Sequence, residues 1–179
     1  MKEGRIVVRL CWYSLLAFRL PPRKTKRTCF KAISSTKNHL RQAVHRQKVS
    51  DVPLGAFLFG GLDSSSVVAF ARELNPNICC VTIELTGIGD EGFSDVLPYA
   101  TRVASHLGLP LDIVQVDVAP IASVLEQIVL QLDEHLAGRA PLIVFFICQL
   151  AREQGIKVLL SGGGSDDNLS IGYRLHPLH

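Results

Sequence analysis

From residue 49 onward, short apolar runs alternate with segments of helical periodicity. The apolar runs predict strands at residues 54–59, 78–85, 111–116 and 157–160. Apolar positions that recur every three or four residues predict helices at residues 32–47, 65–74, 94–107, 121–132 and 142–154. Strands that alternate with helices form parallel β-α-β units. The sequence therefore predicts an α/β fold, a doubly wound and mainly parallel sheet with helices on both faces.

Charge divides the chain into two parts. Residues 1–48 hold thirteen of the nineteen Lys and Arg residues and one of the sixteen acidic residues. We therefore expect a basic N-terminal linker and lead-in helix at residues 1–48, and a globular domain at residues 49–179. Because apolar side chains interrupt the basic residues, we interpret them as a solvated surface rather than as an arm for nucleic acid or for a membrane.

The five cysteines form no C-x-x-C pair and no cluster with histidine, so the sequence does not favour a structural metal site. An odd number of cysteines without a secretory signal is typical of reduced thiols, which predicts a cytoplasmic protein. The apolar run at residues 140–148 is too short to span a bilayer, so no membrane association is expected.

A glycine turn follows the first predicted strand. Residues 58–65 read Leu-Phe-Gly-Gly-Leu-Asp-Ser-Ser, and the next predicted helix begins there. A glycine turn between a strand and a helix presents backbone N–H groups to an anion, and the helix dipole favours negative charge at that point. The sequence therefore predicts a phosphate site, with hydroxyl donors from Ser64 and Ser65 and a carboxylate, Asp63, that suits Mg²⁺.

Two other phosphate motifs are disfavoured. The chain has no Gly-Lys pair, which excludes a Walker A loop. Residues 87–92 fit the dinucleotide pattern G-x-G-x-x-G, with Asp112 further along. However, Asp90 and Glu91 would place two negative charges against a pyrophosphate, and Asp112 lies near the start of its strand instead of its end.

The first loop resembles a known phosphate loop. Residues 59–65 match the Ser-Gly-Gly-Leu-Asp-Ser-Ser sequence of the N-type ATP pyrophosphatases at all positions except the first. Residues 161–167, with Gly172-Tyr173, are similar to the Ser-Gly-x-Gly-x-Asp-Glu…Gly-Tyr motif of asparagine synthetases. Across residues 38–176 the chain resembles the synthetase domain of the glutamine-hydrolysing asparagine synthetases, which has an adenine-nucleotide alpha-hydrolase-like fold.

The resemblance implies an AMP-forming ligase that uses ATP and Mg²⁺. Such an enzyme adenylates the side-chain carboxylate of aspartate, and ammonia derived from glutamine then forms the amide. It also implies that ATP or its pyrophosphate is bound by Leu58, Gly60, Gly61, Asp63, Ser64, Ser65, Ile83, Ser161, Gly162 and Gly164. Asp63 and Asp166 would hold the metal ion. The expected partners are these small molecules, without nucleic acid.

Four departures from the family pattern leave alternatives open. Phe59 replaces a serine, and its ring is expected at the lip of the loop, where it would block the phosphate. Gly163 stands where many relatives have a glutamate, and the spacing before Gly172 is one residue longer. The chain also lacks the length for a glutaminase domain, so we expect the central part of a larger enzyme, with the missing halves as partners. The alternatives are an inactive nucleotide-binding fragment and a related ligase that forms a β-lactam or another amide.

Overall fold

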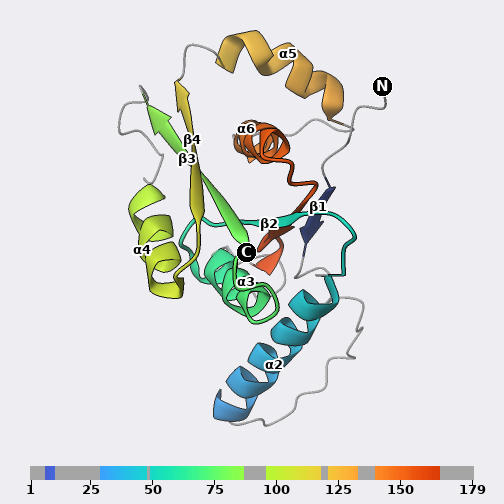
Figure 1. The fold of residues 1–179 in the computed structure, drawn as a ribbon, viewed down its shortest axis with the longest axis vertical. Helices are drawn as coiled ribbons and strands as arrows, with labels where there is room; N and C mark the ends of the chain where they lie inside the picture. Colours follow the sequence, from blue (N-terminus) through green and yellow to red (C-terminus); the bar gives the residue numbers. More distant parts are fainter. Residues whose placement is uncertain are drawn as a thin grey trace, which may run out of the picture.

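A computed structural model describes residues 7–10, 29–47, 49–86, 96–117, 121–132 and 140–165. These residues form one sheet of five parallel strands with helices on both faces, which confirms the predicted doubly wound fold (Figure 1). The strands are β1 (Val7–Leu10), β2 (Leu54–Phe57), β3 (Cys79–Thr86), β4 (Leu111–Asp117) and β5 (Val158–Ser161). Their spatial order is β1-β5-β2-β3-β4.

The order of the strands reverses beside β2. The chain passes from β2 to β3 and then to β4 on one side, after which it returns so that β5 pairs with β2 on the other side. Open α/β sheets bind their ligands at such a reversal, outside the carboxyl ends of the strands. Both glycine loops of the sequence leave the sheet at this place, one after β2 and one after β5.

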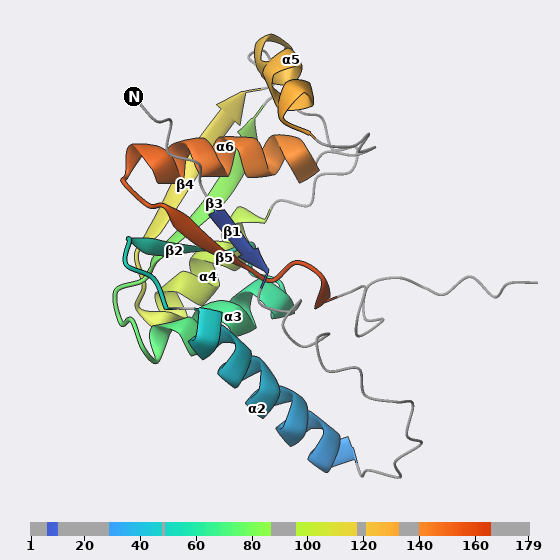
Figure 2. The same ribbon diagram turned by 90° about the vertical axis from the view of Figure 1, so that its right-hand side faces the viewer.

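The helices cover the two faces unequally. Helices α2 (Cys29–Gln47), α3 (Leu62–Arg72) and α4 (Leu97–Leu107) lie on one face, and α6 (Ala140–Glu153) lies on the other with α5 (Ile121–Gln131) packed against it (Figures 1 and 2). A right-handed crossover places a helix on a face set by the direction of strand progression. Helices α3 and α4 therefore share a face, and the return from β4 to β5 carries α5 and α6 to the opposite one.

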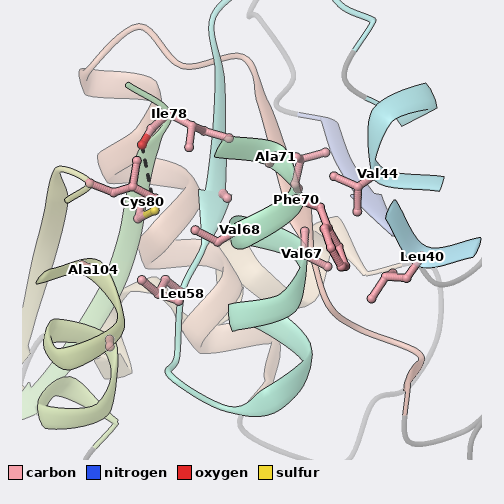
Figure 3. Close-up of a cluster of buried hydrophobic side chains, with 14 residues drawn as sticks. Leu40, Val44, Leu58, Val67, Val68, Phe70, Ala71, Ile78, Cys80 and Ala104 are labelled. Atoms are coloured by element: carbon pink, nitrogen blue, oxygen red, sulfur yellow. Dashed lines mark hydrogen bonds between the residues drawn. The ribbon is translucent and has the colours of Figure 1, made fainter. Parts of the chain in front are cut away.

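Each face has its own apolar core. The larger core joins α2, α3 and α4 to the sheet through side chains such as Val67, Val68 and Leu58, all fully buried (Figure 3). The second core lies between the sheet and α6, around Phe57 and Ile147. Side chains from β2 and the residue after it enter both cores, Ala56 and Leu58 on one face and Phe57 on the other, so the loop that follows this strand starts from a firmly packed position.

Helix α2 is fastened to the end of α3 by a charged cluster. Arg41 Nε donates a hydrogen bond of 3.1 Å to one oxygen of Glu73, and His45 Nε2 lies 3.2 Å from the other. The guanidinium of Arg41 also lies 5.1 Å from the centroid of the Phe70 ring, within the range of a cation–π contact. These contacts hold α3 from the side that faces away from the sheet.

The element boundaries differ from the predicted ones mainly at α3 and β1. Helix α3 begins at Leu62 rather than at residue 65, because Gly61 is extended and serves as the N-cap. Residues Val7–Leu10, which the charge pattern assigns to the linker, form β1 and pair with β5. The division of the chain at residue 48 otherwise stays a prediction. No helix among the described residues has both the length and the apolar character needed to cross a membrane.

Candidate functional site

The first glycine loop ends β2 and begins α3. The Leu58 N–H still donates to the Val81 carbonyl at 3.0 Å, so the strand pairing reaches the edge of the loop. Gly61 then adopts φ −69° and ψ 164° and offers no side chain to cap the helix. The first N–H groups of a helix have no partners within it. The start of α3 therefore presents donors, together with the positive end of the helix dipole, at the carboxyl edge of the sheet.

Gly60 makes the turn possible. Its φ of +77° lies in the left-handed region, where a side chain is strained. A methyl group on Gly60 would also lie 2.4 Å from the carbonyl carbon of Tyr99 and 2.6 Å from the amide nitrogen of Ala100. The backbone of α4 therefore packs directly against the loop at Gly60. Gly61 differs, because a methyl group there would meet nothing within 4 Å, which leaves open space above the loop.

The second glycine loop packs against the first. Gly162 is buried, and a methyl group on it would lie 2.8 Å from the amide nitrogen of Ser64 and 2.9 Å from the carbonyl carbon of Asp63. Beside it, the Gly163 N–H donates to Ser161 Oγ at 3.1 Å. The two loops, far apart in the sequence, are therefore in backbone contact at the point where strand order reverses.

The two serine hydroxyls of the first loop have different surroundings. Ser64 Oγ accepts from the Phe59 N–H at 3.3 Å and lies 3.4 Å from the Gly61 carbonyl, to which it donates, so it braces the loop internally. Ser65 Oγ is buried and has no hydrogen-bond partner among the described residues. A buried hydroxyl without a partner carries a desolvation penalty, which a ligand acceptor would remove.

The ring of Phe59 points away from the space above the glycine loop. Its ring stacks on Phe57 with a centroid distance of 6.2 Å and an interplanar angle of 23°, and it packs against the core beside α6. Residues two apart on a strand point to the same face, which explains why the ring follows Phe57 and not the phosphate loop. The expectation that this ring blocks the phosphate is therefore wrong.

The remaining predicted site residues lie at the same edge or outside the described residues. Leu58 directly follows β2 and Ile83 lies on the neighbouring strand β3, while Ser161 ends β5 and Gly164 lies in the loop after it. Asp166, the second predicted metal ligand, falls outside the described residues. Within the described ranges no group of three metal-ligating side chains is present. Asp63, half-buried in the first turn of α3, is the described carboxylate that suits a cation bridging to phosphate oxygens.

The alternative dinucleotide site finds no support in the position of Asp112. Its carboxylate accepts a hydrogen bond of 2.8 Å from the Cys79 thiol at the amino ends of β3 and β4, the opposite edge from both loops. Residues 87–92, which carry the glycine pattern, lie outside the described residues. Burial, followed by the hydrogen bond from the Cys79 thiol to Asp112 and the nearby charges, raises the pKa of Cys79 to about 12. Burial also raises the pKa of Cys80 to about 12 and that of Cys148 to about 11, so these three thiols are protonated at neutral pH.

Glu84 and Gln115 belong to none of the sequence motifs described above. The two are direct partners in the β3–β4 ladder, and Gln115 Nε2 donates to Glu84 Oε2 at 2.8 Å. A charged residue near the carboxyl end of an otherwise apolar strand was the available signal. The glycine motifs, which carry the family resemblance, include neither residue.

Comparison with known proteins places the chain in a family. The family model described as asparagine synthase matches residues 35–179. A putative glutamine-hydrolysing asparagine synthetase of Mycobacterium bovis is 36% identical over 137 residues, which cover 76% of this chain and 20% of that protein. The glutamine-hydrolysing asparagine synthetase 1 of Bacillus subtilis is 31% identical over 146 residues, which cover 82% of this chain and 22% of that protein.

Other similar proteins carry different names. The amidase chyE of Penicillium rubens is 27% identical over 155 residues, covering 79% of this chain and 22% of that protein. Among solved structures, an NH3-dependent NAD synthetase of Campylobacter jejuni matches with a TM-score of 0.45 and 18% identity, over 81% of this chain and 62% of that one. The chain spans about a fifth of the length of the curated relatives named above. With the family match over residues 35–179 and identities of 31–36% to named synthetases, the chain belongs to the asparagine synthase family.

Proposed function

We propose that this chain supplies the ATP site of an AMP-forming amidoligase of the asparagine synthetase type. The observation that carries the proposal is the backbone contact between Gly162 and the start of α3. This contact joins two glycine loops, each with the sequence of a nucleotide loop, into one surface where the strand order reverses. A chance pairing of two such motifs at that position is a poor explanation.

The phosphate chain of ATP fits the donors of this surface. The first N–H groups of α3 and the Ser65 hydroxyl would bind the β- and γ-phosphates, which leave together as pyrophosphate. Leu58 and Ile83 would contact the adenosine through their backbones, and Ser161, Gly162 and Gly164 would line the opposite side. Gly61, which has open space above it, would let the backbone approach the phosphates closely.

The donor set near Asp63 fits a magnesium ion. Carboxylate oxygens are ligands that Mg²⁺ prefers, usually together with substrate phosphates and water. We propose Asp63 and Asp166 as the protein ligands. When bound, the ion would offset the negative charge that develops on the leaving pyrophosphate.

The reaction proposed for the whole enzyme has two steps. A carboxylate oxygen of aspartate attacks the α-phosphorus of ATP, the bond to the bridging oxygen of pyrophosphate breaks, and an acyl-adenylate forms. Ammonia, supplied directly or from glutamine, then attacks the acyl carbon and AMP leaves with the bonding electrons. The part played by the described residues is to orient the phosphates and to hold the leaving group. We place this activity in the cytoplasm, where thiols such as those of Cys79 and Cys148 stay reduced.

A second candidate is a related ligase with another carboxylic acid as its acceptor. Gly163 stands at the position where many relatives carry a glutamate, and one similar protein bears the name amidase instead of synthetase. We propose aspartate as the first acceptor to test and other carboxylic acids as the next. Because the chain spans about a fifth of its curated relatives, we expect the 179-residue chain by itself to bind ATP with little turnover.

Titration calorimetry with ATP and Mg²⁺ tests the proposal. Substituting Asp63→Asn should weaken ATP binding about tenfold or more in the presence of Mg²⁺, because a charge-assisted contact to the ion is lost. The matched control is Asp51→Asn, which makes the same change at an exposed position before β2, on the opposite edge of the sheet. Absence of ATP binding by the unmodified chain, or equal affinities for both variants, would contradict the proposal.

Pyrophosphate release separates a ligase from a nucleotide-binding fragment. We expect slow release by this chain, increased by aspartate more than by other carboxylic acids. Release that responds equally to every carboxylic acid would favour the second candidate. Release that no carboxylic acid increases, together with tight ATP binding, would favour the inactive nucleotide-binding fragment.

A further inference from the structure

Glu84 presents a fixed carboxylate at the carboxyl end of β3. Gln115 Nε2 donates to its Oε2 at 2.8 Å, and the two residues are direct partners in the ladder. Glu84 is half-buried, whereas Gln115 is exposed. An ionised carboxylate accepts hydrogen bonds at both oxygens, so Glu84 retains acceptor capacity beyond the bond from Gln115.

The alternation of β3 places Glu84 on the face that α4 covers. Val81 and Ile83 belong to the core beside α6, while Cys80 belongs to the core beside α3 and α4. Side chains two apart on a strand share a face. Thr82 and Glu84 therefore lie on the side of Cys80, with Glu84 nearest to the carboxyl end.

Glu84 lies on the strand beside the one that leads into the phosphate loop. Phe57, the last residue of β2, pairs with Val81, and β3 continues past this pair through Glu84 to Thr86. Gly60 in that loop is the residue against which the backbone of α4 packs. Neighbouring strands lie about 4.8 Å apart, so Glu84 is one strand removed from the loop proposed to hold the phosphates.

Thr82, on the same face as Glu84, has a hydroxyl without a hydrogen-bond partner among the described residues. Thr82 is fully buried, and its Oγ1 makes no hydrogen bond among the described residues. It precedes Glu84 by two residues on the same face. A Glu–Gln pair on a sheet surface usually contributes only a cross-strand contact. Here the Glu84–Gln115 pair lies toward the carboxyl edge of the sheet, where the proposed ATP site is. It is two residues beyond Thr82, whose hydroxyl has no hydrogen-bond partner among the described residues.

We propose that Glu84 is a specificity-determining residue that accepts a hydrogen bond from the exocyclic amino group of the adenine of ATP, with Gln115 as its positioning residue. This inference rests on the proposed function. A carboxylate repels phosphate oxygens, so the nucleoside end of the ligand lies beside it. The nucleoside would extend from the loop across β3, where the backbone of Ile83 is proposed to contact it. Adenine presents a donor at this position, whereas guanine presents a carbonyl oxygen that the carboxylate repels.

Binding of three triphosphates to the full chain tests the assignment: ATP, GTP and purine riboside triphosphate, which lacks the amino group. We expect the unmodified chain to prefer ATP over purine riboside triphosphate about tenfold or more, since a hydrogen bond to a charged group is lost. Glu84→Ala should bring that ratio close to one. Glu84→Gln, which keeps the shape and offers a donor, should raise the affinity for GTP relative to ATP.

Two further variants define the control and the positioning role. Glu126→Gln makes the same charge change at an exposed position on α5, the helix beyond the opposite face, and should leave every ratio unchanged. Gln115→Leu should lower the preference for ATP over purine riboside triphosphate by a smaller factor than Glu84→Ala, because the carboxylate stays but is no longer held. Circular dichroism and melting curves would verify that each variant is folded.

The possible failures are distinguishable. If the unmodified chain binds none of these nucleotides, the proposed function fails and this inference fails with it. If the chain binds ATP, but the preference over purine riboside triphosphate is absent or survives Glu84→Ala, the inference alone is overturned. If Glu84→Ala instead abolishes discrimination against 2′-deoxy-ATP, the carboxylate contacts the ribose and the assignment to the base is wrong.

Discussion

The polar groups at the two edges of the sheet differ in whether they have hydrogen-bond partners within the protein. At the amino edge, the Cys79 thiol donates to Asp112 at 2.8 Å and lies 3.8 Å from Gln154 Oε1, while the Lys157 N–H donates to the Pro53 carbonyl. At the carboxyl edge, Ser65 Oγ is buried without a partner among the described residues, and Gly61 leaves α3 uncapped by a side chain. These polar groups of the amino edge are paired within the protein, whereas those named at the carboxyl edge have no partner among the described residues.

This difference separates structural polar residues from candidate ligand-binding ones. Buried polar groups in folded proteins nearly always have hydrogen-bond partners. Asp112 has such a partner, although a motif in the sequence made it a candidate for ribose binding. Ser65 has none in the described part of the chain, and it lies where the strand order reverses. Whether a polar side chain already has a hydrogen-bond partner therefore separates structural residues from candidate ligand-binding ones, which the spacing of sequence motifs alone does not do.

The largest effect should come from separating the two loops. Gly162→Ala places a methyl group 2.8–2.9 Å from the backbone of α3, which cannot yield as a flexible side chain would. We expect a loss of about 1–3 kcal/mol in the free energy of unfolding and a fall of about tenfold or more in ATP affinity. Chemical denaturation and calorimetry measure the two effects.

Gly155→Ala is the control for that substitution at the amino edge. Gly155 has a φ of +77°, but a methyl group there meets nothing within 4 Å. Backbone strain should cost about 1 kcal/mol of stability, and ATP affinity should not change. Equal losses of ATP affinity in both variants would remove the distinction between the two edges.

The next effect divides the two serines of the first loop. Ser65→Ala removes a buried donor without a described partner, so ATP affinity should fall about tenfold while stability is unchanged or slightly raised. Ser64→Ala breaks the bonds to the Phe59 N–H and the Gly61 carbonyl, so stability should fall by about 1–2 kcal/mol. The same calorimetric and denaturation measurements apply. The reverse pattern would mean that Ser64, not Ser65, contacts the phosphates.

The smallest effect on ATP affinity concerns the amino edge, where changes should alter stability alone. Burial comes first among the causes that raise the pKa of Cys79 from 9.0 to about 12. Between these two pH values the unfolded thiol has lost its proton and the folded one has kept it, so the unfolded state binds fewer protons. Stability from this group is therefore fully present below pH 9.0 and is lost as the pH rises toward 12. Denaturation at increasing pH, with Cys79→Ala as the comparison, measures this contribution.

Alkylation of Cys79, followed by mass spectrometry of its peptide, provides a second measurement. Labelling at pH 9 should be slow in the folded chain and several-fold faster in Asp112→Asn, because the nearby charge raises the thiol pKa. Asp51→Asn again serves as the control, and ATP affinity should stay constant in both variants. A change of ATP affinity in Asp112→Asn would show that the amino edge is coupled to the nucleotide.

Most of the fold from residue 49 onward was predictable, because burial against a sheet imposes its periodicity on the sequence. The strand β1 was not, since Val7–Leu10 lies in a basic segment and its pairing depends on β5, a partner distant in sequence. The contact of Gly162 with α3 was not predictable either, because it also joins segments that are far apart in the sequence. The position of the Phe59 ring was predictable, because alternation with Phe57 sets its face, whereas the resemblance to a serine-containing loop wrongly predicted that the ring points to the phosphate.

The return of the chain from β4 to β5 has a consequence for biosynthesis. One loop follows β2, and the other follows β5, which is synthesised after β2 and is the last of the described strands. Contacts between segments far apart in sequence form late, because the intervening chain must be closed first. Under the proposed function, a nascent chain would therefore be unable to retain ATP until β5 has docked beside β2. Nucleotide retention would then report that β5 has paired with β2, and cellular ATP would stabilise only chains in which this pairing has formed.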